Sequence, residues 1–171
     1  IRGWNDAGWM SLSTQIGDRI APLVGAEPGQ VIMGDTLSIK VHQALAAALA
    51  LSPGRKVILS DYGNFPSDLY MAQGLIKMLD RGHTLKIVAP EDVSHHIDDE
   101  VAVLMLTEVD YRTGRKHDMK ALTATAHAHG VITLWDLAHS VGALPVDLVG
   151  SRVDFAVGCT YKYLNGGPGA P

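Results

Sequence analysis

The sequence contains one cysteine, Cys159, among its 171 residues. A lone cysteine excludes a disulfide bond within the chain, and sparse cysteine is typical of proteins from reducing compartments. Cys159 itself stands in an apolar stretch, where a cysteine usually serves as a packing residue. We therefore expect a cytoplasmic protein without structural disulfides.

Long apolar runs and basic clusters are also missing. The longest purely apolar run, Ala44 to Leu51, is far too short to span a bilayer. No stretch has the pattern of a secretory signal. The formal net charge is −4 and no block of basic residues occurs, which makes nucleic acids and anionic membranes poor candidate partners.

What the sequence does have is ordinary globular composition. Hydrophobic residues make up 47% and charged residues 19%, enough to enclose a core in a domain of this length. The chain starts at Ile1 without an initiator methionine and stops at Pro171 directly after a loop. We therefore expect a piece of a larger protein.

Strand-like and helix-like segments alternate along most of the chain. This alternation predicts an α/β fold with three layers, in which a mostly parallel sheet carries helices on both faces. We expect residues 1–22 to form an N-terminal segment, with a possible helix from Ser13 to Ile20, that leads into one large domain, residues 23–171. Strands are expected at residues 31–33, 56–60, 84–89, 101–106, 131–135 and 155–158, and helices at 37–51, 66–79 and 118–129.

Polar residues collect where these strands end. They follow five strands, at residues 34–38, 62–68, 107, 136–140 and 162. Ligands of open α/β sheets bind outside the carboxyl ends of the strands, so we expect these residues to meet in one crevice.

Lys162 is the main candidate for chemistry in that crevice. A short apolar run follows Asp154 and precedes this lysine, and a glycine-rich turn that ends at Gly169 comes after it. This order would hold one amine at the end of a buried strand. Such an amine suits Schiff-base chemistry. The alternative is an ordinary surface lysine.

Asp136 is the second candidate, flanked by apolar Trp135 and Leu137. A buried carboxylate requires a positive partner. The protonated ring nitrogen of pyridoxal phosphate is one, since that cofactor uses a lysine Schiff base and an acidic partner. A simple helix-capping role for Asp136 stays open.

Further candidates are less distinctive. The turn at Thr36 to Ser38 opens a helix whose start favours a phosphate, although simple capping explains it equally well. It is neither a P-loop nor a GxGxxG motif. Phe65 could stack on a cofactor or sit in the core, and Asp68 could cap a helix or act in the site. The histidines lack the spacing and the companion ligands of a metal centre, so we expect no metal.

Four motifs together resemble the kynureninases, pyridoxal-phosphate hydrolases of fold type I in the class V aminotransferase group. The motifs are FPSDLY at residues 65–70, YRTG at 111–114, WDLAHS at 135–140 and YKYLNGGPG at 161–169. The resemblance extends over essentially the whole chain. Asp-x-x-His and a lysine at a strand end occur widely in that superfamily, whereas FPSDLY and YKYLNGGPG are more specific.

The resemblance implies a role for each matching residue. Lys162 would form the Schiff base, Asp136 would pair with the pyridine nitrogen beside His139, and Asp68 would add a second carboxylate. Lys162, Asp136 and Asp68 are thus the implied catalytic residues. The implied cofactor-binding residues are Leu37, Ser38, Phe65, Pro66, Ser67, Asp68, Thr107, Asp136, His139, Tyr161 and Lys162.

The resemblance also implies hydrolysis of L-kynurenine, with 3-hydroxykynurenine as a possible second substrate, to anthranilate and L-alanine in tryptophan catabolism. It implies a homodimer, and a C-terminal small domain that this chain lacks, so that the chain alone would be inactive. One alternative is another class V enzyme, such as a cysteine desulfurase or selenocysteine lyase. Another is a non-catalytic α/β binding module.

Overall fold

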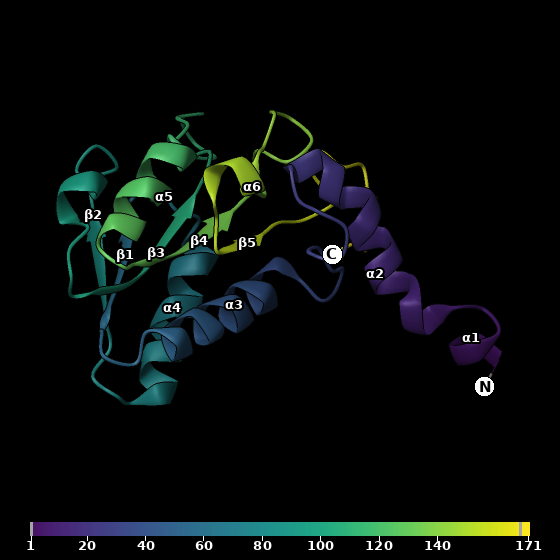
Figure 1. Cartoon of the computed structure of the whole chain (residues 1–171), viewed down its shortest axis with the longest axis horizontal. Coiled ribbons are helices and arrows are strands. Elements are labelled where there is room, and N and C mark those ends of the chain that lie inside the picture. The colour runs from purple at the N-terminus through teal and green to yellow at the C-terminus, as the bar shows by residue number, and fades with distance from the viewer. Residues whose placement is uncertain (1, 168) are drawn as a thin grey trace.

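The computed structural model describes residues 2–167 and 169–171 of the chain. From residue 37 onward helices and strands alternate, as the sequence predicts (Figure 1). In chain order the elements are α1 (Arg2–Asn5), α2 (Trp9–Ile20), the 3-10 helix η1 (Ala21–Val24), α3 (Leu37–Leu51), β1 (Val57–Asp61), α4 (Pro66–Leu79), β2 (Thr84–Val88), the 3-10 helix η2 (Val93–His96), β3 (Val101–Thr107), α5 (Met119–Ala128), β4 (Ile132–Asp136), α6 (Leu148–Ser151) and β5 (Phe155–Val157).

The five strands form one sheet in the order β2-β1-β3-β4-β5, and every neighbouring pair is parallel. Helix α4 connects β1 to β2, α5 connects β3 to β4, and α6 lies between β4 and β5. The central strand β3 is buried along its whole length, which explains its continuous apolar sequence. The predicted parallel α/β fold is confirmed.

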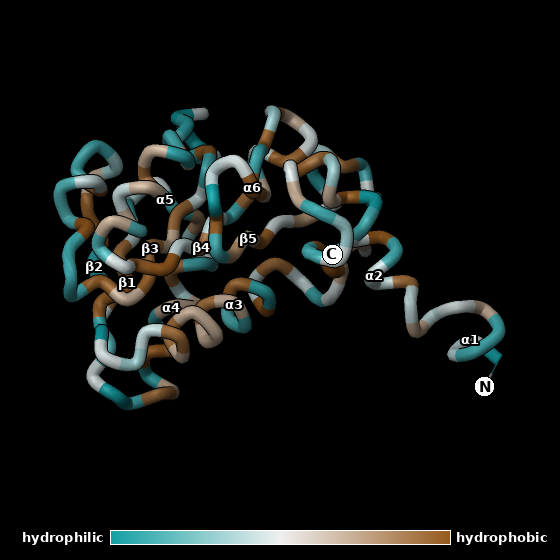
Figure 2. Tube along the Cα trace, in the orientation of Figure 1, coloured by the Kyte–Doolittle hydropathy of each residue, from teal (hydrophilic) through white to brown (hydrophobic). Residues whose placement is uncertain are grey.

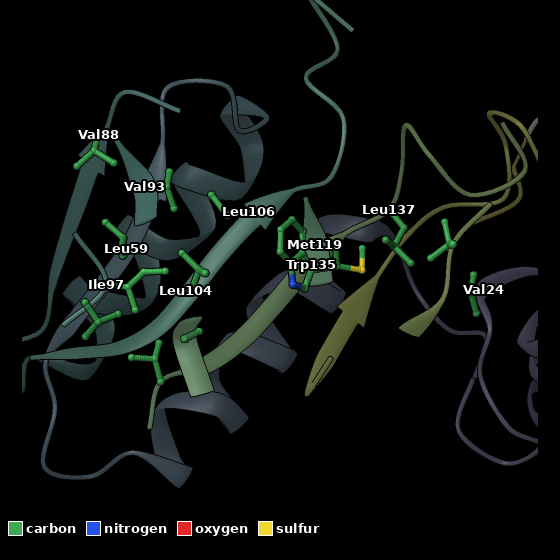
Figure 3. Packing of buried hydrophobic residues seen from close by; sticks show 14 of the residues in the cluster. Val24, Leu59, Val88, Val93, Ile97, Leu104, Leu106, Met119, Trp135 and Leu137 are labelled. Carbon is green, nitrogen blue, oxygen red and sulfur yellow. The ribbon is translucent and has the colours of Figure 1, made fainter. Parts of the chain in front are cut away.

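Helices cover both faces of this sheet, as predicted (Figure 1). Helices α3 and α4 bury Leu45 and Leu75 against one face. On the other face, α5 packs Met119 against Trp135 of β4, in the cluster drawn in Figure 3. Figure 2 shows the same division, with hydrophobic residues along the sheet and its facing helix turns and hydrophilic residues in most outer loops.

Two helix boundaries follow directly from local chemistry. Helix α4 spans the predicted residues, with Pro66 in its first turn, where a missing N–H costs nothing. Helix α5 begins after Asp118, whose side chain accepts a hydrogen bond from Ala121 N at 2.9 Å.

The strand predicted at residues 31–33 is wrong. This segment has no strand pairing in the structure, because its backbone is engaged by α2 instead. Met33 N donates to Ser13 O at 3.2 Å, and Ser13 Oγ donates to Met33 O. Gly17 permits this close approach, since a Cβ there would overlap the Val31 carbonyl.

Three smaller predictions also need correction. Helix α2 starts at Trp9, earlier than the predicted Ser13, after Gly8 in the left-handed conformation. The spacing of apolar residues in the helix predicted at 37–51 places Leu51 on the buried face, but Leu51 is exposed and Leu49 is buried in its place. The helix start at Leu37 is confirmed, whereas the Thr36 side chain accepts no capping hydrogen bond.

Helices α1 and α2 extend away from the sheet at the N-terminal end of the chain (Figure 1). The division into residues 1–22 and 23–171 stays a prediction. Ile1, and Pro168 of the YKYLNGGPG motif, lie outside the described residues. In the part of the chain that the structure describes, no helix combines the length and apolar character that a bilayer crossing requires.

Candidate active site

The candidate site lies at the carboxyl ends of the central strands. Thr107 ends β3 and Asp136 ends β4, and the two are direct partners in the parallel ladder. Both are almost completely buried. The sheet register therefore fixes a hydroxyl and a carboxyl side by side at the edge where α/β sheets bind ligands.

Asp136 keeps one oxygen without a partner. Its Oδ1 accepts a hydrogen bond from Ala138 N at 2.8 Å, whereas the buried Oδ2 has no hydrogen-bond partner among the described residues. An unsatisfied buried carboxylate oxygen is costly in free energy. This position therefore calls for a donor or a cation from a ligand.

Asp68 brings a second carboxyl group next to the first. It lies in the first turn of α4, is 1% exposed, and its Oδ1 accepts a bond from Ser67 Oγ at 3.3 Å. Burial, and then repulsion from Asp136, raise the pKa of Asp68 to about 7. Burial also raises the pKa of Asp136, to about 6, although the Ala138 N–H and the Lys162 charge oppose the rise.

The ligand-free protein should lose stability as Asp68 ionises. The folded carboxyl holds its proton up to about pH 7, and the unfolded one only up to its ordinary pKa of 3.8. The folded state therefore binds more protons in this interval, and the free energy of unfolding falls as pH rises through it. Asp68→Asn should remove up to about 4 kcal/mol of this pH dependence and should be more stable than the wild type above pH 7.

Urea denaturation at a series of pH values, with each variant free of cofactor, measures this effect. The exposed Asp92, whose side chain caps nothing, provides the control Asp92→Asn. An unchanged pH profile in Asp68→Asn would contradict the assignment.

Lys162 reaches into the same site from the loop after β5. Its Nζ lies 2.7 Å from His139 Nε2, and 5.5 Å from the centre of the Phe65 ring. Burial, together with the Lys162 charge, lowers the pKa of His139. The imidazole is therefore neutral at physiological pH and accepts a hydrogen bond from the ammonium group.

Three rings line this part of the site. Phe65 and Tyr111 meet edge to face with centroids 5.0 Å apart, and His139 lies 5.9 Å from Phe65 and 6.0 Å from Tyr111. Tyr111 belongs to the YRTG motif, but the sequence assigns it no role. Only the fold places it here, because its hairpin follows β3 directly.

Gly142 lets the two loops that carry His139 and Lys162 pass close to each other. It has a positive φ of 82°, and a Cβ there would come within 2.6 Å of Tyr163 O, next to Lys162. Gly142→Ala should therefore displace Lys162 and weaken binding of the cofactor that the resemblance implies, pyridoxal phosphate, about tenfold or more.

Gly82→Ala is the matched control for that substitution. Gly82 has a similar positive φ of 75° but nothing within 4 Å of its added Cβ. The control carries the same backbone strain and should keep full cofactor affinity. Equal affinity losses in both variants, measured by cofactor titration, would contradict the packing argument.

The other predicted residues fall into two groups. Pro66 and Ser67 open α4 beside Asp68, and Tyr161 lies next to Lys162 with its ring centroid 5.8 Å from Nζ. Leu37 and Ser38 form the first turn of α3, and no hydrogen bond among the described residues joins them to Lys162 or Asp136.

A cavity of about 710 Å³ borders β5, and none of Lys162, Asp136 and Asp68 lines it. Its lining is mainly apolar and includes Val31, Ala156 and Cys159. The site assignment therefore rests on the Lys162 and Asp136 groups and not on cavity size. Within residues 2–167 and 169–171, no three His, Cys, Asp or Glu side chains gather as metal ligands would.

The chain matches the family described as Aminotransferase class-V over residues 10–170. It is 53% identical to a kynureninase of Pseudomonas fluorescens over 99% of its length, and 54% identical to one of Burkholderia pseudomallei over 100% of its length. In each case it spans only 42% of the relative.

Solved structures with the same fold are more distant in sequence. An alanine–glyoxylate aminotransferase of Nostoc sp. matches 96% of this chain and 45% of its own, with a TM-score of 0.72 at 20% identity. A cysteine desulfurase of Thermococcus onnurineus matches 95% of this chain and 42% of its own, with a TM-score of 0.71 at 20% identity. At this identity the likeness concerns the fold.

Proposed function

The chain belongs to the class V aminotransferase family, and from this premise we propose that it forms the cofactor-binding part of a kynureninase. The proposed reaction is hydrolysis of L-kynurenine to anthranilate and L-alanine with pyridoxal phosphate. The similarity to curated kynureninases at 53–54% identity along nearly the whole chain carries the choice of substrate.

The residues of the site fit pyridoxal phosphate. The unpartnered Oδ2 of Asp136 suits a protonated pyridine nitrogen, Phe65 offers a ring face, and Lys162 offers an amine. The Thr36 side chain leaves the first N–H groups of α3 uncapped, which favours binding of a phosphate by Leu37 and Ser38. When bound, the cofactor supplies an aldehyde for the lysine and a sink for the electrons of the Cα–H bond.

Lys162 is the proposed nucleophile and base. Its amine would hold the cofactor covalently and, once free, would accept the proton from the substrate Cα. His139 holds Nζ at 2.7 Å and directs it toward the site. Tyr161, the neighbouring residue, is proposed to contact the cofactor phosphate.

The two carboxyl groups are proposed to control the charge at the ring. Asp136 holds a proton at the pyridine nitrogen, since a cation beside it also satisfies its buried oxygen. Asp68, which accepts a bond from Ser67 Oγ, would supply a second negative charge once a cationic ring beside it lowers its pKa from the value of about 7 in the ligand-free protein. Thr107 lies next to Asp136 and is proposed to add a hydroxyl group to the cofactor site. Its Oγ1 donates to Val109 O at 3.3 Å.

The net reaction consumes one water molecule. The bond between Cβ and Cγ of the substrate breaks, hydroxide from water ends on Cγ to give the carboxyl group of anthranilate, and Cβ takes up a proton to give alanine. Pro66 and Ser67 are proposed to position Phe65 and Asp68 around the cofactor at the start of α4.

The alternative of a cysteine desulfurase or selenocysteine lyase, enzymes with a catalytic thiol, finds little support in Cys159. The thiol is buried, and burial raises its pKa, which disfavours the reactive thiolate. The alternative of a non-catalytic module is disfavoured by Asp136. Its unsatisfied buried oxygen costs free energy, and a module without a ligand would gain nothing in return.

Assembly and location are part of the same proposal. A homodimer is supported by the exposed Trp4, Trp9 and Met10 on α1 and α2, since aromatic residues and methionine are enriched at protein interfaces. The single, reduced cysteine supports the cytoplasm.

The test uses the purified protein that contains this chain, supplied with pyridoxal phosphate and L-kynurenine. Anthranilate is followed by its fluorescence, and 3-hydroxykynurenine and cysteine are offered in parallel. Anthranilate formation that depends on the cofactor supports the proposal. Cofactor binding with turnover of cysteine alone would redirect it to a desulfurase, and a protein that binds no cofactor would refute it.

A further inference from the structure

A buried Asp–His pair outside the proposed chemistry joins two loops of the site. Asp61 ends β1 and is fully buried, and its Oδ2 lies 2.6 Å from His117 Nε2. The other oxygen, Oδ1, accepts a hydrogen bond from Gly63 N at 2.7 Å. The His117 ring packs edge to face against Trp135, with centroids 6.3 Å apart.

The pair fastens the base of a hairpin that we name the 108–117 hairpin. Its two arms meet at the antiparallel bridge between Val109 and Lys116, and His117 N donates to Glu108 O at 2.9 Å. His117 is the last residue of the hairpin, and Asp61 directly precedes the loop at residues 62–65. Their contact therefore joins these two segments.

A second contact joins the same segments at the hairpin tip. Arg112 Nη2 donates to Tyr62 O at 2.6 Å. Burial alone would raise the pKa of Asp110, but the Arg112 N–H, the Thr113 hydroxyl and the Arg112 guanidinium lower it, so that this carboxylate holds the tip in shape. The hairpin is therefore attached to the 62–65 loop at both of its ends.

Each segment carries one ring into the site. Phe65 ends the 62–65 loop and Tyr111 lies at the hairpin tip, with their centroids 5.0 Å apart. The centre of the Phe65 ring lies 5.5 Å from Lys162 Nζ, and Tyr111 is 44% exposed. The relative placement of the two rings thus depends on how the hairpin and the loop are attached.

We propose that Asp61 and His117 are positioning residues that hold Phe65 and Tyr111 together as one aromatic wall against the bound cofactor. The inference rests on the proposed function, because it assumes that this site binds pyridoxal phosphate. Neither residue of the pair touches the reacting atoms. Loss of the pair lets the hairpin and the loop move apart, and the wall then contacts the ring less well.

The chain contains a matched control pair. His127 Nε2 lies 2.9 Å from Asp154 Oδ2, and Asp154 precedes β5 and also accepts from Thr133 N. This second pair lies at the amino ends of β4 and β5, opposite the site. His117→Phe keeps a ring against Trp135 and loses the hydrogen bond, and His127→Phe makes the same change away from the site.

The experiment measures the dissociation constant of pyridoxal phosphate by absorbance titration, well below the melting temperature of each variant. We expect His117→Phe to bind the cofactor about tenfold or more weakly, and His127→Phe to bind it as the wild type does. Asp61→Asn, whose side chain can still form a hydrogen bond with His117, should retain most of the wild-type affinity for the cofactor. Arg112→Ala, which detaches only the exposed tip, should weaken binding in the same direction and covers the case in which His117→Phe does not fold.

The outcomes separate the two proposals. Weaker binding in the site variants with normal binding in His127→Phe supports the positioning role, even if kynurenine is not a substrate. Unchanged affinity in His117→Phe or Arg112→Ala, or equal losses in both histidine variants, overturns it. A wild-type protein that binds no cofactor overturns both proposals, and one that binds cofactor without hydrolysing kynurenine overturns only the proposed reaction.

Discussion

Replacing Lys162 with alanine is expected to reduce kynurenine hydrolysis by roughly 10³-fold or more, because one amine is proposed as both nucleophile and base. In the structure Nζ is held by His139 at 2.7 Å. No other lysine takes part in the contacts described for the site, so none is in place to substitute for it.

The measurement compares anthranilate formation and the visible absorbance of the bound cofactor in Lys162→Ala and the wild type. Lys77→Ala, at an exposed position in the last turn of α4, is the control and should behave as the wild type. Retention of substantial turnover by Lys162→Ala would remove the lysine from the mechanism. A change in absorbance is a separate readout, because it reports the covalent attachment and not the rate.

Replacing Asp136 with asparagine should produce the second large effect. Asparagine preserves the shape of the side chain and can still accept the bond from Ala138 N, but it lacks the charge that is proposed to hold a proton on the pyridine nitrogen. Loss of a buried charge partner costs about 3–5 kcal/mol, which corresponds to a loss of turnover of roughly 10²- to 10⁴-fold.

Kinetics of Asp136→Asn at saturating cofactor test this expectation, with Asp92→Asn as an exposed control. The loss should appear in kcat, since the charge matters most when electrons move into the ring. A variant with normal kcat and only weaker cofactor binding would show that Asp136 anchors the cofactor without activating it.

The sequence alone determined the class of the fold and most of its elements. Alternation of apolar strands with amphipathic helices is a local signal, and it predicted α4 at its observed bounds and β3 as a strand. Sequence also singled out Lys162 and Asp136, because a lone charge beside an apolar run stands out without any knowledge of contacts.

Only the tertiary structure determined which segments pair and which side chains from distant parts of the chain are in contact. Residues 31–33 have the sequence of a strand, yet their backbone bonds to α2, since pairing depends on which partner lies nearby. The contact between Asp61 and His117, and the placement of Tyr111 beside Phe65, join segments far apart in sequence. Periodicity reports which face of an element is buried, whereas side-chain contacts between elements depend on strand order and register, which the fold alone establishes.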